Sequence, residues 1–127
     1  MPALDPHPPL AFDESGAPLS TLYGDVFRSR AGAWSEARAV FVEGCELPQR
    51  WGAQACDAEC ASFTILELGF GLGVGFLATL QAWRERGGAP ARLHYVSVEA
   101  HPLAADDLRR ALEALGAPAH DAQCLLS

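Results

Sequence analysis

The sequence contains no lysine, so all nine of its basic residues are arginine. Sixteen aspartate and glutamate residues outnumber them and give a formal net charge of −7. This balance argues against a chain of 127 residues that binds nucleic acid through a broad basic face. Without lysine there is also no G-x-x-x-x-G-K sequence, which excludes a phosphate-binding P-loop.

Long hydrophobic segments are missing as well. The longest uncharged apolar stretch, residues 68–80, is too short to span a membrane and is interrupted by four glycines. Residues 1–10 carry no positive charge, so no secretory signal is expected. Hydrophobic residues make up 50% of the chain, which is enough for one core. We therefore expect a cytoplasmic protein that does not contact a membrane.

Cysteine is scarce and poorly placed for a metal. Of the four cysteines, Cys56 and Cys60 are four residues apart, but no second pair accompanies them. Neither His94 nor His101 has ligand-like spacing to that pair. We expect reduced thiols and no metal site.

Residues 1–60 predict a loop-rich N-terminal extension with a short hairpin and a helix. Two extended segments, Leu10–Phe12 and Ala17–Leu19, flank a turn. Ser35 is a suitable cap for a helix that begins at Glu36 and ends at Gly44. Its buried stripe would comprise Ala37, Val40 and Phe41. A strand over residues 38–42 is the alternative, because its Val-Phe-Val sequence is β-prone.

Residues 61–127 predict an alternation of strands and helices. The expected elements are a strand at Phe63–Leu68, a helix at Phe76–Arg86, a strand at Leu93–Val98 and a helix opened by Pro102. The first helix would bury Phe76, Leu77, Leu80 and Trp83, and the second Leu108, Leu112 and Leu115 before Gly116 stops it. This order predicts a parallel βαβ unit, the start of a doubly wound α/β sheet and thus of a partial Rossmann-like cofactor-binding domain.

A further strand is predicted near Cys124, where the sequence stops. Two parallel strands are a poor end for a domain, because such sheets are normally covered on both faces. We therefore expect the chain to be the front part of a longer protein.

A glycine-rich motif, Glu67-Leu68-Gly69-Phe70-Gly71-Leu72-Gly73, lies between the first strand and the first helix. The glycines would let a ligand approach the backbone, and the helix would direct free N–H groups at it. Dinucleotide sites use G-x-G-x-x-G, but Val74 occupies the third glycine position counted from Gly69. A G-x-G-x-G sequence preceded by an acid favours S-adenosylmethionine. A dinucleotide site and a purely structural turn remain the alternatives.

Two acids complete the predicted site. Glu67 would favour the cationic sulfonium of S-adenosylmethionine and would repel a pyrophosphate. Glu99, at the tip of the second strand, is placed to accept both ribose hydroxyls, which serves either ligand. The predicted cofactor-binding residues are Glu67, Gly69, Phe70, Gly71, Gly73 and Glu99.

With these residues, the sequence resembles the methyltransferase domain of the bacterial bifunctional tRNA 5-methylaminomethyl-2-thiouridine biosynthesis protein, from about Leu10 to Leu115. The resemblance rests on an ordered set: residues 24–27, Ser35–Arg38, Val40–Val42, Gly44, Leu47-Pro48, Arg50-Trp51, Glu67–Gly71, Phe76–Ala78, Ser97–Glu99, Pro102-Leu103 and Asp107-Leu108. Departures are Arg28 for an aromatic residue, Cys45 for Asn, Leu72 for Thr and Gly75 for Asn.

The resemblance implies N-methylation of an aminomethyl group on a wobble uridine of tRNA, with S-adenosylmethionine as methyl donor. It also implies a fused oxidase domain that uses FAD, of which these residues show nothing. The acceptor site and the catalytic base would lie beyond Ser127, so we expect this chain alone to be inactive. The competing hypotheses are a non-catalytic fragment that at most binds S-adenosylmethionine, and the opening of a nucleotide-dependent oxidoreductase.

Overall fold

The computed structural model describes residues 7–21, 25–26, 32–53, 62–87 and 90–127. It divides into two compact units. The first comprises Met1–Ala33, Gly71–Gly73 and Glu99–Ser127, and the second comprises Trp34–Phe70 and Val74–Val98. Cys56 and Cys60, like Gly24, Phe27 and Arg28 of the resemblance, lie outside the described residues.

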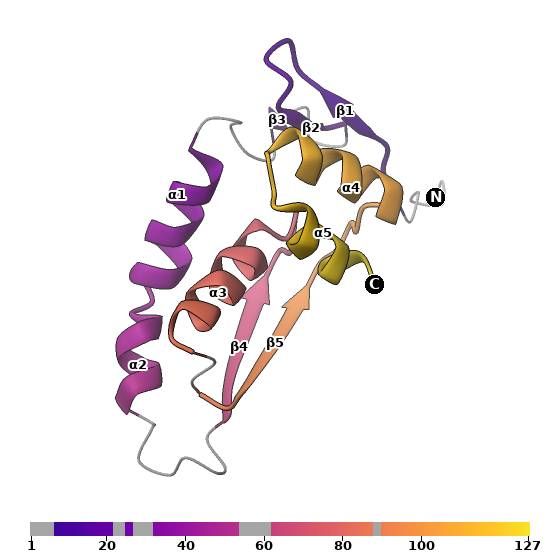
Figure 1. Ribbon diagram of the computed structural model, residues 1–127. Helices are drawn as coiled ribbons and strands as arrows, with labels where there is room; N and C mark the ends of the chain where they lie inside the picture. Colours follow the sequence, from indigo (N-terminus) through magenta and orange to yellow (C-terminus); the bar gives the residue numbers. More distant parts are fainter. Residues whose placement is uncertain (1–6, 22–24, 27–31, 54–61, 88–89) are drawn as a thin grey trace. The chain divides into compact units, whose positions relative to one another are not determined.

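The second unit contains the predicted parallel strands. Strand β4 (Ser62–Leu68) pairs with β5 (Arg92–Val98), in register from Ser62 opposite Arg92 to Leu68 opposite Val98. Helix α3 (Val74–Glu85) connects them and lies against one face of the pair (Figure 1). Exposure alternates along both strands, as one covered face requires. The predicted βαβ order is therefore confirmed.

The opposite face of this pair carries apolar side chains in contact with solvent. Leu68 is 81% exposed and Leu66 65%, and Val96 and Val98 are also exposed. A doubly wound sheet has helices on both faces. The described residues of this unit thus form a βαβ unit, and a complete Rossmann-like sheet stays a prediction.

The buried face of α3 differs from the predicted one. The helix begins at Val74 rather than Phe76, and Phe76, Leu80 and Trp83 are only partly buried. The buried set is Val74, Gly75, Leu77, Ala78, Thr79 and Ala82. The reason is that a second helical segment packs on α3, so the helix is covered on more than its sheet-facing side.

That second segment is a helix, so the alternative of a strand over residues 38–42 is wrong. Helix α1 (Ala33–Ala37) continues into the π-helix η1 (Arg38–Glu43). The helix begins before Glu36, directly after Gly32 with its φ of +81°, and Ser35 lies inside it.

The stripe predicted for this helix is also wrong at Val40, which is 54% exposed. Ala37 and Val42 are buried instead. These two residues are five apart, and a π-helix brings such residues to one face because its hydrogen bonds join i to i+5. The bond from Gly44 N to Ala39 O, 2.8 Å long, has this spacing.

Sequence reasoning missed the helix α2 (Leu47–Ala53). Its signal was Pro48, since proline is favoured in the first turn of a helix. Trp51 is 1% exposed and packs edge-to-face on Phe63 of β4, with 6.3 Å between ring centroids. This contact anchors the beginning of β4 on α2.

In the first unit, the predicted hairpin is confirmed. Strand β1 (Leu10–Phe12) pairs antiparallel with β2 (Pro18–Ser20), and a short strand β3 (Asp25–Val26), which was not predicted, pairs with β2. The turn is held by Asp13, whose Oδ1 accepts hydrogen bonds from Ser15 N at 2.8 Å and Ala17 N at 2.9 Å. Such Asx turns are the reason aspartate favours this position.

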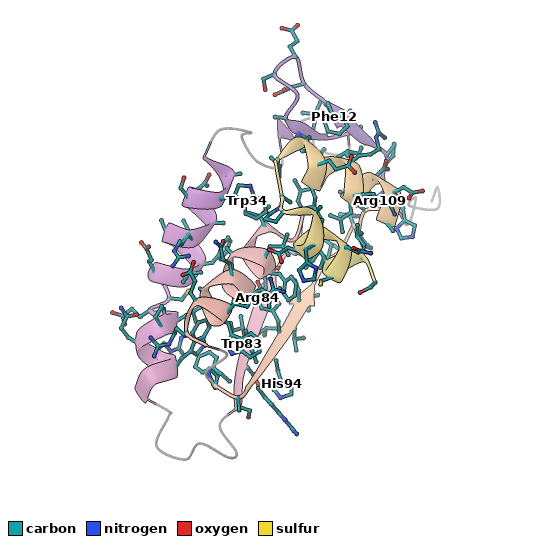
Figure 2. The ribbon with its side chains drawn as sticks, viewed as in Figure 1. Phe12, Trp34, Trp83, Arg84, His94 and Arg109 are labelled. Carbon is teal, nitrogen blue, oxygen red and sulfur yellow. The ribbon has the colours of Figure 1, made fainter. Side chains whose placement is uncertain are left out.

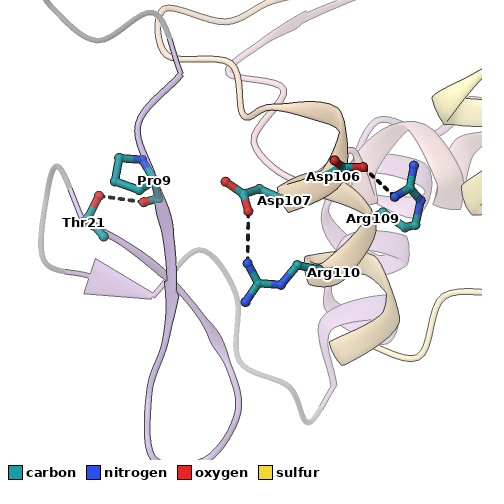
Figure 3. A network of polar contacts seen from close by, with 6 residues as sticks. All are labelled: Pro9, Thr21, Asp106, Asp107, Arg109 and Arg110. Atoms are coloured by element: carbon teal, nitrogen blue, oxygen red, sulfur yellow. Dashed lines mark hydrogen bonds and ion pairs between the residues drawn. The ribbon is translucent and has the colours of Figure 1, made fainter.

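Helix α4 (Ala105–Ala114) begins three residues after Pro102, which therefore does not open it. The better signal was the pair Asp106 and Asp107, because acids favour the first turn of a helix. Both form ion pairs three residues along, with Arg109 at 2.6 Å and Arg110 at 3.2 Å (Figure 3). The stripe is largely confirmed, with Leu112 and Leu115 buried and Leu108 half-buried.

The predicted stop at Gly116 is confirmed, and the predicted strand near Cys124 is wrong. Gly116 has a φ of +71°, and its N–H bonds Glu113 O while Ala117 N bonds Leu112 O. This is the Schellman pattern that ends a helix at glycine. A further helix, α5 (Ala119–Leu126), follows and packs on α4, because Ala122 presents a small buried side chain there.

Candidate functional site

The glycine-rich segment has the backbone that only glycine adopts without strain. The φ angles are +85° at Gly69, +56° at Gly71 and +75° at Gly73, all in the left-handed region. A Cβ added to Gly69 or Gly71 would meet no heavy atom within 4 Å. The space beside the backbone is therefore open at these two positions, which is what the approach of a ligand requires.

Glu99 clamps this segment within the first unit. Its Oε2 accepts a hydrogen bond from Gly71 N at 2.9 Å, and its Oε1 accepts one from His101 N at 2.9 Å. Burial acts to raise the pKa of Glu99, but the hydrogen bonds from these backbone groups outweigh it and leave the pKa below its ordinary value. The carboxylate is therefore charged at neutral pH and oriented by the loop.

The clamp leaves capacity for a ligand. A carboxylate offers about four acceptor positions, and the hydrogen bonds from Gly71 and His101 place one of these backbone donors on each oxygen. A charged acceptor of this kind binds hydroxyl donors strongly, and two neighbouring hydroxyls suit its two oxygens. The arrangement is thus suited to a vicinal diol such as a ribose.

Glu67 has a different environment, in the second unit. Its Oε2 accepts a hydrogen bond from the Tyr95 hydroxyl at 2.5 Å, and its Oε1 accepts one from Ser97 Oγ at 2.8 Å. Burial, and then the hydrogen bond to Glu67, raise the pKa of Tyr95 well above its ordinary value, so the phenol keeps its proton. The side chain of Glu67 is therefore engaged by the neighbouring strand.

The six residues predicted to bind the cofactor fall into both units. The structure brings Gly71 and Glu99 into direct contact in the first unit, which also holds Gly73. Glu67, Gly69 and Phe70 belong to the second. There Gly69 N donates to Val98 O at 2.7 Å and extends the ladder between the strands. Phe70 is half-buried.

Sequence reasoning missed Tyr95, Ser97 and Gly75 as partners of Glu67. A signal was present, because aligning the two predicted strands at their ends places Ser97 opposite Glu67, as the register shows. Tyr95 precedes Ser97 by two residues and so shares its face. Gly75 could not be found this way, since its contact depends on how closely α3 approaches β4.

Other chemistry-bearing groups are dispersed. Among the described residues no three His, Cys, Asp or Glu side chains gather to hold a metal ion. His94 lies in β5 with its side chain exposed (Figure 2). Cys45 and Cys124 are free and exposed. None of the described helices is long and apolar enough to span a membrane.

Comparison with known proteins confirms the resemblance to the bifunctional tRNA-modification protein. The chain is 51% identical over 102 residues to the tRNA 5-methylaminomethyl-2-thiouridine biosynthesis bifunctional protein MnmC of Burkholderia thailandensis. It is 50% identical over 102 residues to the proteins of the same name from Burkholderia mallei and Burkholderia pseudomallei. Each match covers 80% of this chain and 15% of the relative, so the chain spans about 15% of the length of these curated relatives. No protein-family model matches it.

Proposed function

We propose that this chain binds S-adenosylmethionine through Gly71, Gly73 and Glu99, as the cofactor-binding part of a tRNA-modifying methyltransferase. The observation that carries the proposal is the clamp between Glu99 and the backbone of Gly71, at 2.9 Å. It holds a charged acceptor beside a backbone with open space around it. The ribose hydroxyls of the cofactor would donate to the free acceptor positions of Glu99.

S-adenosylmethionine fits these residues better than a dinucleotide does. In the dinucleotide motif, the third glycine allows close helix packing near a pyrophosphate. Here that position holds Val74, whose side chain is 2% exposed.

We infer the substrate from the similarity to the bifunctional proteins. Their name describes the biosynthesis of a methylaminomethyl uridine in tRNA. We infer that the chain matches their methyltransferase part, and that the reaction is N-methylation of an aminomethyl group on a wobble uridine. S-adenosylmethionine supplies an electrophilic methyl group when bound, and the substrate amine must lose a proton as it attacks.

The contribution of the described residues to that reaction is positional. Glu99 would orient the ribose, and the backbone at Gly71 and Gly73 would admit the ligand at close range. Positioning of this kind supplies much of the rate in a transfer between two bound groups. We propose none of the described residues as the base that takes the amine proton. We propose tRNA as the partner because the relatives' name includes it, and an oxidase part that uses FAD because the sequence resemblance implies one.

Isothermal titration calorimetry tests the proposal. We expect S-adenosylmethionine to bind the purified chain with a single saturating transition, and NADH to produce no binding heat at the same concentrations. Binding of NADH in preference would support the oxidoreductase alternative. Absence of binding for both ligands would contradict the proposed site.

A further inference from the structure

Glu67 was predicted to contact the cofactor, but its surroundings indicate another role. Both carboxylate oxygens are already hydrogen-bonded, to Tyr95 at 2.5 Å and to Ser97 at 2.8 Å. Both donors are side chains of β5, so the carboxylate ties β4 to β5. It also lines a cavity of about 370 Å³ together with side chains of η1, α2 and α3. Its carboxylate therefore lies on the face of the strand pair that α3 covers.

The first turn of α3 approaches this carboxylate closely. A Cβ added to Gly75 would lie 2.6 Å from Glu67 Oε2, and 3.4 Å from the Tyr95 hydroxyl and from Phe41. Glu67 thus occupies the space that a side chain at position 75 would need. Thr79 donates to Gly75 O at 2.8 Å and Phe76 packs edge-to-face on Tyr95, so the same turn is held from further sides.

This close approach lies beside both ends of the glycine-rich segment. Residues 69–73 begin directly after Leu68, the last residue of β4, and end directly before Val74, the first residue of α3. Glu67 is next to the first end and Gly75 is next to the second. Because both ends belong to the second unit, the separation between them is set by how closely α3 approaches β4.

We propose that Glu67 is a positioning residue for cofactor binding, which acts through Gly75 and is itself oriented by Tyr95 and Ser97, and that it does not touch the cofactor. The inference rests on the proposed function, because it concerns the same glycine-rich segment. It assigns a role to Tyr95 and Ser97 and replaces the expected attraction between Glu67 and a cation.

Three ligands separate positioning from direct contact. S-adenosylmethionine carries a sulfonium and an amino-acid group, S-adenosylhomocysteine lacks the sulfonium charge, and methylthioadenosine lacks both. If Glu67 acts by positioning, Glu67→Gln weakens all three by the same factor, about tenfold, because small misplacements of a binding segment carry penalties of this order or larger. Tyr95→Phe lowers the affinity for all three ligands by one common factor as well. In the double variant, Tyr95→Phe lowers the affinity little further, because both substitutions act on the same contact.

Thr64→Val is the matched control. It removes a hydroxyl from β4 on the face opposite Glu67, and we expect it to leave all three affinities unchanged. Tyr95→Phe keeps the ring that packs on Phe76, so this variant can test the positioning role if Glu67→Gln folds poorly. Circular dichroism and urea unfolding of each variant check that the comparison is made on folded chains.

Each result decides between the roles. A loss confined to S-adenosylmethionine would show Glu67 near the sulfonium, and a loss that spares only methylthioadenosine would show it near the ammonium. Either result overturns the positioning role while leaving the proposed function intact, and so does unchanged binding of every ligand by both variants. A wild-type chain that binds none of the three overturns the proposed function, and with it this inference.

Discussion

Gly71→Ala is expected to abolish the binding of S-adenosylmethionine while leaving the chain folded. The φ of +56° at this position costs an alanine about 1–2 kcal/mol, so the free energy of unfolding falls by roughly that amount. The added Cβ meets nothing in the free chain but would enter the space proposed for the ligand. Calorimetry should therefore record no binding heat at concentrations that saturate the wild type.

Gly116→Ala separates the loss of stability caused by backbone strain from the loss of ligand binding. Gly116 has a φ of +71° and open space around its Cβ position, but it ends α4 and belongs to no proposed ligand contact. We expect a similar loss of unfolding free energy, measured in urea, and unchanged affinity. Equal affinities of wild type and Gly71→Ala would show that the ligand does not approach Gly71.

Glu99→Ala should weaken S-adenosylmethionine by about 10- to 150-fold. Hydrogen bonds to a charged acceptor contribute about 1.5–3 kcal/mol, and removal of the carboxylate also leaves Gly71 N and His101 N without their acceptor. The variant loses both the contact to the ribose and the constraint on the loop. Titration of the ligand into each variant measures the change directly.

The pH dependence of stability gives an independent check on the clamp. The folded-state pKa of Glu99 lies below its ordinary value, so its stabilisation is fully present at neutral pH. It is lost as the pH falls from the ordinary glutamate range, about 4.3, through the lower folded-state value. Glu99→Gln should therefore flatten the decline of the urea midpoint in acid. An unchanged acid decline would show that the carboxylate is not held by the loop.

The sequence predicted those helices and strands that are determined by residues close together in the chain. The parallel strands follow from two short apolar runs, and the end of α4 follows from a glycine that adopts positive φ. The exposed Val40 shows where such reasoning fails, because the period of a π-helix cannot be read from an α-helical pattern. The prediction of the buried face of α3 failed for another reason. The helix is covered by η1 as well as by the strands, and the sequence pattern gave no sign of that second contact.

The predictions about the candidate site succeeded and failed for similar reasons. Glu99 was predicted to bind the ligand from its place directly after the second strand. Because the glycine-rich segment follows the neighbouring strand, the same reasoning could have predicted the contact between Glu99 and Gly71. Glu67 was assigned by charge alone, although aligning the two predicted strands would have placed Ser97 and Tyr95 on its face, where both donate to its oxygens. The approach of Gly75 to Glu67 could not be predicted, because it depends on how closely α3 packs on β4.

We propose that the loop at Gly71 and its partner Glu99 form the S-adenosylmethionine site. The most direct measurement is a titration of the ligand into the isotope-labelled chain, followed by NMR spectra of the backbone amides. We predict saturable shifts of the Gly71 and His101 amides, because both donate to Glu99, and smaller changes at Gly116. Binding that leaves the Gly71 and His101 amides unshifted while others move would contradict the account.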